Sequence, residues 1–193
     1  MLKTNDIYYG DKIIITVNVT SVDEIIDNGT VSIYLNNERF DKSVENGTVI
    51  FEAPTLDAGT YAVNITFDGG NHYAKPTISS QFNVLKRNAT ISASDNSYVI
   101  NYGGKYSATI KGVVGEKVTF TLDGKVIGSA ITNANGVATI SLSAKILKAT
   151  KAGTKNMVIK LDNPNYQPNV KKVKITVNKE KTKLVAKNKK FKK

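Results

Sequence analysis

The sequence repeats itself after about 93 residues, and this internal repeat limits what the chain can fold into. Three short motifs of the first half recur in the second: Tyr9-Gly10 as Tyr102-Gly103, Asn46-Gly47 as Asn135-Gly136, and Ala58-Gly59-Thr60 as Ala152-Gly153-Thr154. The offsets are 93, 89 and 94 residues, so length changes are confined to loops. A repeat of this length is close to the size of one small β-sandwich. The sequence therefore predicts two copies of one domain.

Apolar and polar residues alternate with a period of two through most of the chain. In the segment 12–19, the residues Ile13, Ile15, Val17 and Val19 fall on one face and polar residues on the other. One buried face per strand is what an antiparallel sheet packed on one side requires. The same reasoning predicts strands at 31–35, 48–51, 61–67, 77–84, 106–110, 118–122, 137–142, 157–161 and 170–177. We therefore expect an all-β fold.

Turn-forming pairs separate these strands. Asn46-Gly47, Asp123-Gly124 and Asn135-Gly136 tolerate the positive φ angles of tight hairpins. Only residues 143–150 have helical periodicity, over about two turns. We expect this segment to cross from one sheet to the other.

The domain limits follow from the repeat and from a polar stretch between two strand patterns. We expect the first domain to span residues 1–87 and the second to span residues 88–178, joined by a short linker at Lys86-Arg87-Asn88. Residues 179–193 form a basic tail that looks like the first strand of a further repeat. No segment is apolar enough to predict a membrane-spanning helix.

The net charge of +11 is unevenly distributed. Residues 1–88 carry seven basic and eleven acidic side chains, whereas residues 89–193 carry twenty and five. The tail 179–193 alone holds eight lysines and one glutamate, which can attract anionic polymers or membranes. Arginine is the side chain that reads guanine and stacks on bases, and the chain has only two arginines, Arg39 and Arg87. We therefore expect no specific nucleic-acid binding and interpret the tail as a solvated segment.

Several kinds of chemistry lack the residues that they need. The chain has no cysteine and a single histidine, His72, which disfavours disulfides, transition-metal sites and histidine-based catalysis. Asp23, Glu24 and Asp27 form an acidic loop without the alternating spacing of a calcium loop. No glycine-rich loop joins a strand to a helix, so nucleotide binding has no support. We expect no enzyme activity, no metal and no cofactor.

The residues around the repeated turns resemble a known family. Asp-Gly-Lys-Val-Ile-Gly (123–128), Asn-Gly-Val-Ala (135–138) and Asn-Pro-Asn-Tyr (163–166) look like prokaryotic immunoglobulin-like repeats, above all those of adhesin-like surface proteins of methanogenic archaea. The resemblance implies two tandem immunoglobulin-like β-sandwich domains in an exported, cell-surface protein. It also implies either a monomeric adhesin module that contacts a glycan or protein of another cell, or a stalk that binds nothing. Cysteine and tryptophan are both absent, which excludes the antibody-type core.

The candidate site residues are potential glycosylation sites and two structural positions. Asn-X-Ser/Thr sequons, which can carry glycans in an exported protein, begin at Asn18, Asn28, Asn46, Asn64 and Asn88. The chain has twenty asparagines, and by composition alone these would produce about three sequons. The excess suggests, without requiring, a glycosylated first domain.

Tyr61 and Lys155 occupy equivalent places in the two repeats. Tyr61 begins a late strand after a glycine turn, where a sandwich often places a tyrosine whose hydroxyl bonds to nearby backbone. Lys155 begins on the predicted inward face of its strand, and a buried lysine requires a partner. The lysine either extends its amine toward solvent or forms an isopeptide bond with an asparagine. An intact mass lower by one ammonia would reveal that bond.

Overall fold

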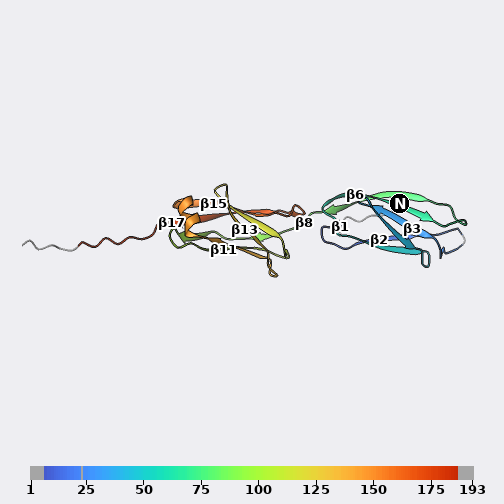
Figure 1. The fold of residues 1–193 in the computed structure, drawn as a ribbon, viewed down its shortest axis with the longest axis horizontal. Coiled ribbons are helices and arrows are strands. Elements are labelled where there is room, and N and C mark those ends of the chain that lie inside the picture. Colours follow the sequence, from blue (N-terminus) through green and yellow to red (C-terminus); the bar gives the residue numbers. More distant parts are fainter. Residues whose placement is uncertain (1–6, 23, 187–193) are drawn as a thin grey trace, which may run out of the picture. The chain divides into compact units, whose positions relative to one another are not determined.

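The computed structural model describes residues 7–22 and 24–186. The chain forms mostly β-strands and one short helix (Figure 1). It divides into two compact units. The first comprises Met1–Asn88 with Pro164–Gln167, and the second comprises Ala89–Asn163 with Pro168–Lys193.

The first unit contains two packed sheets. The larger has the strand order β1 (Ile7–Tyr8), β7 (Thr77–Leu85), β6 (Gly59–Asp68), β3 (Thr30–Leu35) and β4 (Glu38–Ser43). The smaller pairs β2 (Ile13–Asn18) with β5 (Thr48–Ala53). A two-residue strand, β8 (Arg87–Asn88), pairs in parallel with β16 (Tyr166–Gln167).

The second unit repeats this plan. Its five-stranded sheet has the order β10 (Asn96–Val99), β17 (Val170–Asn178), β15 (Gly153–Leu161), β12 (Lys117–Leu122) and β13 (Lys125–Ile131). Its three-stranded sheet has the order β14 (Val137–Leu142), β11 (Gly104–Ile110) and β9 (Ile91–Ser92). Helix α1 (Ala144–Thr150) leads from β14 in one sheet to β15 in the other, which confirms the predicted short helix. The Ser143 hydroxyl caps it by accepting from the Ile146 N–H at 3.3 Å.

The topology identifies both units as immunoglobulin-like sandwiches. In the second unit, the first two strands lie in different sheets. β9 pairs with β11 in the smaller sheet, and β10 runs parallel to the last strand, β17, in the larger one. In the first unit β1 likewise runs parallel to the last strand, β7. The remaining pairs within these sheets are antiparallel. The predicted fold class, tandem immunoglobulin-like β-sandwiches, is therefore confirmed.

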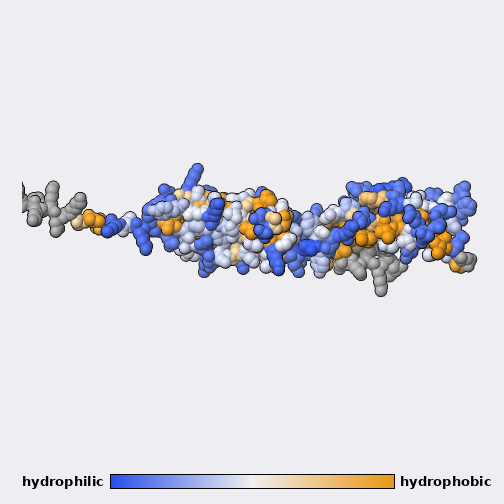
Figure 2. All heavy atoms as spheres, turned by 90° about the horizontal axis from the view of Figure 1, so that it is seen from below, coloured by the Kyte–Doolittle hydropathy of each residue, from blue (hydrophilic) through white to orange (hydrophobic). Residues whose placement is uncertain are grey.

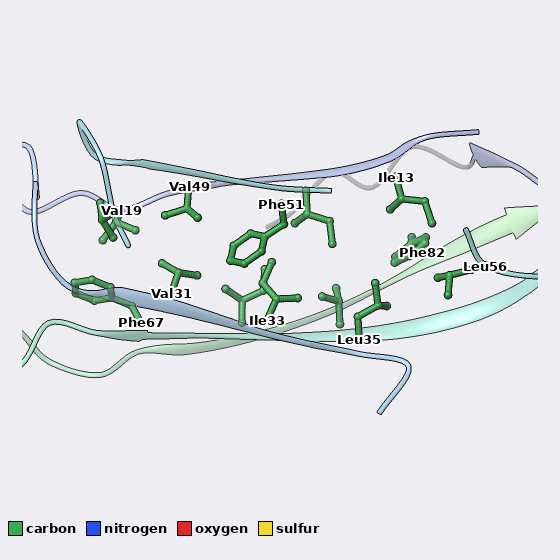
Figure 3. Packing of buried hydrophobic residues seen from close by; sticks show 14 of the residues in the cluster. Ile13, Val19, Val31, Ile33, Leu35, Val49, Phe51, Leu56, Phe67 and Phe82 are labelled. Carbon is green, nitrogen blue, oxygen red and sulfur yellow. The ribbon is translucent and has the colours of Figure 1, made fainter. Parts of the chain in front are cut away.

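The core of the first unit lies between its two sheets. Figure 3 shows Val49 and Phe51 of β5 pointing toward Val31 and Ile33 of β3. All four side chains are buried. They come from the alternating positions of each strand, because successive residues of a strand point to opposite faces of its sheet.

The second unit has an equally closed core around Phe120. Phe120, on the central strand β12, and Ile159, on β15, have no exposed surface. Tyr106 meets the Phe120 ring edge-on, with the ring centroids 6.2 Å apart and an interplanar angle of 81°. The Tyr106 hydroxyl, the one polar atom of this pair, donates to the Ser94 carbonyl oxygen at 2.6 Å. The core thus contains a buried phenol whose ionisation would be costly.

Raising the pH above about 10 should destabilise the second unit through Tyr106. Burial raises the pKa of Tyr106 from 10.0 to about 12. Below about pH 10 the phenol is protonated in both the folded and the unfolded chain. Above about pH 10, only the unfolded chain releases the proton. The free energy of unfolding therefore falls by at most about 1.4 kcal/mol per pH unit. The urea midpoint of Tyr106→Phe should therefore fall less between about pH 9 and about pH 11 than that of the unmodified chain. Equal losses would contradict this role.

Candidate binding surface

The five sequon asparagines all lie on the surface of the first unit but do not form one site. Each of them is exposed, and they occupy β2, β6, β8 and two loops. The Asn18 carboxamide oxygen accepts a hydrogen bond from the Thr48 hydroxyl at 3.3 Å. Asn64 lies on the outer face of β6, between two residues with buried side chains. Glycosylation at these positions stays a prediction.

Tyr61 joins the start of β6 to the loop before it. Its hydroxyl donates to the Asp57 carbonyl oxygen at 2.9 Å. Its ring stacks on Phe82 of β7, with the centroids 5.9 Å apart. The side chain therefore combines an apolar contact within the sheet with a polar contact to the preceding loop.

Replacing Tyr61 with phenylalanine should reduce the free energy of unfolding by about 1 kcal/mol, the net value of one such hydrogen bond. The ring contact with Phe82 stays in place, so the change isolates the hydroxyl. Tyr34→Phe is a matched control, because this ring is 43% exposed and its loss of a hydroxyl should cost little. Urea unfolding of both variants makes the comparison. If Tyr61→Phe is as stable as Tyr34→Phe, the hydroxyl does not stabilise the loop.

Lys155 is half-buried on β15 and lies beside a carboxylate. Its Nζ is 3.5 Å from Asp123 Oδ2, and its side chain is 19% exposed. Asp123 occupies the turn between β12 and β13, and its other carboxylate oxygen accepts from the Asn156 N–H at 2.9 Å. This ion pair provides the partner that a partly buried lysine requires. We therefore expect the intact mass to show no loss of ammonia.

The acidic loop of the first unit uses its carboxylates as hydrogen-bond acceptors. Glu24 accepts from the Tyr73 hydroxyl at 2.6 Å, and Asp27 accepts from the backbone N–H of Asn46. Asp23 lies outside the described residues. Within residues 7–22 and 24–186, no group of three or more histidine or acidic residues is arranged to hold a metal ion.

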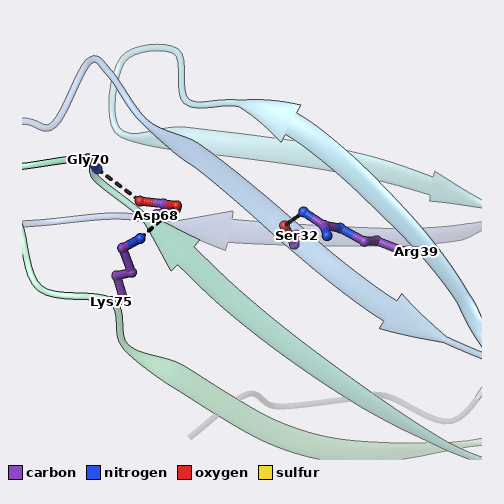
Figure 4. A network of polar contacts seen from close by, with 5 residues as sticks. All are labelled: Ser32, Arg39, Asp68, Gly70 and Lys75. Atoms are coloured by element: carbon purple, nitrogen blue, oxygen red, sulfur yellow. Dashed lines mark hydrogen bonds and ion pairs between the residues drawn. The ribbon is translucent and has the colours of Figure 1, made fainter.

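Figure 4 shows two sets of polar contacts in the larger sheet, one at the end of β6 and one between β3 and β4. Asp68 accepts from Lys75 Nζ and from the Gly70 N–H, each at 3.0 Å. The hydrogen bond from Lys75, and then that from Gly70, lowers the pKa of Asp68. Arg39 donates from Nη2 to the Ser32 hydroxyl at 3.1 Å. Arg39 also forms an ion pair with Asp41 of β4, with Nε 2.8 Å from Oδ1.

On β3, β6 and β7, the outer face of the larger sheet presents mainly uncharged polar side chains, and Arg39 and Asp41 of β4 border it. The strand register places Tyr34 of β3 opposite Asn64 of β6, and Asn64 opposite Ser79 of β7. The neighbouring row pairs the hydroxyls of Thr66 and Thr77 at 3.0 Å. Because this face points away from the core, its hydroxyl and amide groups are available to a ligand.

At one end of this face lies a shallow depression of about 430 Å³, which we call the Tyr34 depression. It is lined by Tyr34, Asn36, Asn37, Thr60, Tyr61, Ala62 and Asn64. Asn36 and Asn37 form the turn between β3 and β4 and have φ angles of 51° and 64°. The volume lies in the range of small-molecule sites, which combine an aromatic surface with a few polar groups.

The chemistry of the Tyr34 depression suits a carbohydrate. Asn36, Asn37 and Asn64 each provide an amide donor and a carbonyl acceptor, as sugar hydroxyls require. The partly exposed ring of Tyr34 offers an apolar surface, and the Arg39 guanidinium carbon lies 5.6 Å from its centroid. No row of aromatic residues in the sequence predicts this surface. The Asn36-Asn37 pair is the local signal that would have placed a tight turn here.

The face of the chain that Figure 2 shows is largely hydrophilic, with apolar areas between the polar ones. Exposed apolar residues include Ile14 and Ile50 on the outer face of the β2–β5 sheet. None of the helices in the described part of the chain is long and apolar enough to cross a membrane.

The known proteins that resemble this chain are solved structures of low sequence identity. No protein-family model and no curated protein matches it. Among solved structures, it is similar to the I9–I11 tandem of titin, with 8% identity over 91% of this chain and 63% of that one and a TM-score of 0.47. A tetra-tandem repeat from the extending region of a large adhesion protein gives 13% identity, 86% and 50% coverage, and a TM-score of 0.43.

A third similar structure is a Ca²⁺-stabilized adhesin with which an Antarctic bacterium binds ice. It gives 16% identity over 89% of this chain and a TM-score of 0.35. This chain spans only 45% of that adhesin chain. The likeness is one of architecture and identifies no ligand for this chain.

Proposed function

We propose that this chain is an extracellular, adhesin-like module of a cell-surface protein, and that its first unit contacts a surface glycan at the Tyr34 depression. The observation that carries the proposal is the lining of that depression. Hydroxyl and carboxamide groups surround the partly exposed ring of Tyr34, with Tyr61 beside it. The lining itself contains no charged side chain and offers many weak polar contacts, which suits a neutral sugar.

The sandwich architecture supports display at a surface. Each unit has its own buried core, as a domain that repeats along a chain requires. Tandem copies of such a domain extend a chain by simple repetition, while the exposed sheet faces and loops remain available for binding. The sequons of the first unit are consistent with an exported protein.

Replacing Tyr34 with alanine should weaken glycan binding at least tenfold, because the apolar surface of the site is lost. Tyr34→Phe keeps the ring and should bind within a few-fold of the unmodified chain. A glycan array, followed by titration of the best ligand against all three proteins, makes this measurement. The site assignment fails if Tyr34→Ala binds as tightly as Tyr34→Phe.

Asn64 decides which form of the protein can be tested, because it both lines the depression and begins a sequon. A glycan attached to its carboxamide nitrogen would occupy the space that a ligand needs. The array is therefore performed with unglycosylated protein. Binding by that form, and its loss when Asn64 is glycosylated, is the expected pattern.

The second candidate function is a stalk that binds nothing. In each unit, a residue just after the last long strand is fixed by contacts with the start of the same unit, and this favours the stalk. Arg87 forms an ion pair with Asp11 and donates to the Tyr9 carbonyl oxygen at 2.6 Å. In the second unit, Glu180 accepts from the Asn101 carboxamide and from the Tyr102 hydroxyl. Fixing the exit of the chain in each repeat suits a stiff spacer. The array separates the two functions, because a stalk shows no selective binding.

A further inference from the structure

The second unit contains a pocket between helix α1 and the hairpin that joins β12 to β13. It has a volume of about 380 Å³, which is within the range of small-molecule sites. It is lined by Leu122, Asp123, Lys125, Val126, Ile127, Lys145, Ile146, Ala149 and Thr150. All nine residues lie between positions 122 and 150, so one unit forms the whole pocket.

Helix α1 presents one of its faces to this pocket. Its lining residues are spaced three or four apart around the helix, so their side chains share a face: Lys145, Ile146, Ala149 and Thr150. Leu147 has no exposed surface and anchors the helix in the core. The Thr150 hydroxyl donates to the Ile146 carbonyl oxygen at 2.8 Å and is therefore already engaged. The helix thus contributes an apolar surface and one ammonium group to the pocket.

The β12–β13 hairpin forms the other side of the pocket. The strand register leaves only two residues in its turn, Asp123 and Gly124, with φ angles of 45° and 81°. Lys125 follows this turn directly, and the next residue, Val126, is 63% exposed. Asp123 is already paired, since its Oδ2 lies 3.5 Å from Lys155 Nζ. The hairpin thus adds a second ammonium group and more apolar surface.

The two lysines of the pocket have no acidic partner in the described part of the chain. Within residues 7–22 and 24–186, neither Lys125 nor Lys145 forms an ion pair. Residues 89–193 hold five acidic side chains, and each of these contacts another residue: Asp95, Glu116, Asp123, Asp162 and Glu180. Two uncompensated ammonium groups beside an apolar surface favour an anion that carries an apolar group.

The first unit carries the opposite charge at the equivalent place. Glu38 follows its two-residue turn, as Lys125 follows the turn of the second unit. In place of α1, residues 54–58 read Pro-Thr-Leu-Asp-Ala, with one acid and no lysine. Leu56 of this loop is buried, as Leu147 of α1 is. The two repeats share a scaffold here, and the positive charge of the pocket belongs to the second.

The size of the pocket favours a small ligand over a protein partner. A stable protein interface involves about 20–30 residues on each side, whereas nine residues line this pocket. Lysine is a compact charge that does not impose the forked geometry of arginine, so it suits a simple anionic head group. A carboxylate that carries an alkyl chain combines such a head group with an apolar body.

We propose that this pocket of the second unit binds a small amphiphilic anion, an alkyl chain with a carboxylate head group. The head group lies near the ammonium groups of Lys125 and Lys145, and the chain packs against the apolar residues of the lining. Attraction to two positive charges and removal of the chain from water both contribute to affinity. The site shares no residue with the Tyr34 depression and is independent of glycan binding.

Titration of the full chain with decanoate, followed by nuclear magnetic resonance of the backbone amides, tests the site. We expect saturable binding, with shifts concentrated in the residues that line the pocket. Replacing both lysines, Lys125→Gln with Lys145→Gln, should weaken binding at least tenfold, because the head group loses both charges. Lys171→Gln with Lys172→Gln is the matched control. It removes the same charge from exposed positions on β17 and should bind within about twofold of the unmodified chain.

A further variant and a second ligand test the apolar part of the site. Val126→Ser keeps both lysines and changes a mostly exposed side chain, so the fold stays intact while decanoate binding should weaken about threefold or more. Decanol has the same chain without the charge and should bind the unmodified chain at least tenfold more weakly than decanoate does.

Four results would each overturn the proposal: no saturable binding of decanoate, equal affinity of the two double-glutamine variants, equal affinity for decanol and decanoate, or no loss in Val126→Ser. Vesicles that contain phosphatidylglycerol provide the remaining comparison. Attachment to these vesicles that is lost in Lys125→Gln with Lys145→Gln, without any binding of decanoate, would also overturn it and would indicate a membrane surface as the partner.

Discussion

Replacing Phe120 with alanine should reduce the free energy of unfolding of the second unit by about 4 kcal/mol, in the range measured for buried aromatic residues. Phe120 lies on the central strand of the five-stranded sheet and has no exposed surface. Its loss removes the edge-on contact with Tyr106 and leaves a cavity between two rigid sheets that collapse only in part. Denaturant unfolding, followed by a signal from the second unit, measures the loss.

Val126→Ala is the matched control for this prediction. Val126 lies on β13, in the same sheet, but is 63% exposed. Its truncation should change stability by less than about 0.5 kcal/mol. If Phe120→Ala and Val126→Ala cost the same, the core of the second unit is not centred on β12.

Replacing Gly136 with alanine should be nearly as damaging, with an expected loss of about 3 kcal/mol or more. Gly136 has a φ of +72°, and a Cβ at this position would lie 2.2 Å from the Ile110 carbonyl oxygen. The clash involves backbone that is itself bonded to this turn, since the Ile110 N–H donates to the Gly136 carbonyl oxygen at 2.8 Å. The turn between β13 and β14, which packs against the end of β11, therefore cannot adjust without moving backbone.

Gly112→Ala separates the clash from the backbone strain. Gly112 has a φ of +75°, almost that of Gly136, but a Cβ there would meet nothing within 4 Å. Its replacement should cost only about 1 kcal/mol, the strain of a left-handed alanine. Thermal or urea unfolding of both variants gives the difference. Equal losses would show that the close approach to Ile110 is relieved by a small shift.

Most strands with one buried face could be predicted from sequence, whereas the polar edge strands β4 and β13 could not. Residues of β2 and β6 alternate because one face of each is buried. β4 reads Glu-Arg-Phe-Asp-Lys-Ser and β13 is exposed along most of its length, so neither carries an apolar period. Both are outermost strands of their sheets, where polar side chains discourage pairing with other chains. The positions of β4 and β13 follow from the turns that precede them rather than from an apolar pattern of their own.

The Tyr34 depression depends on long-range pairing that local patterns do not define. Tyr34 and Asn64 meet because β3 and β6 pair in one particular register, across thirty residues of sequence. A shift of one residue would turn Tyr34 toward the core. Likewise, Lys155 was expected to begin on the inward face, but its carboxylate partner, Asp123, lies in a distant turn. The turn-forming residue pairs could be predicted from the sequence, but the side-chain contacts that these turns create could not.

Two features of the chain can produce glycan binding for different physical reasons. In the proposed function, the Tyr34 depression would bind through short-range contacts of uncharged groups, which salt affects little. The lysines of the tail attract anionic polymers over a longer range, and added salt screens that attraction. Salt dependence therefore distinguishes a built site from nonspecific charge.

The measurement that tests the central claim most directly is glycan binding across a salt series for three proteins: the unmodified chain, Tyr34→Ala, and a chain with Lys179, Lys181 and Lys183 replaced by glutamine. We predict that the unmodified chain and the glutamine variant bind the same glycans with equal affinity at low and high salt, and that Tyr34→Ala does not bind. Binding that disappears in the glutamine variant or as salt rises, while Tyr34→Ala still binds, would contradict the proposed function.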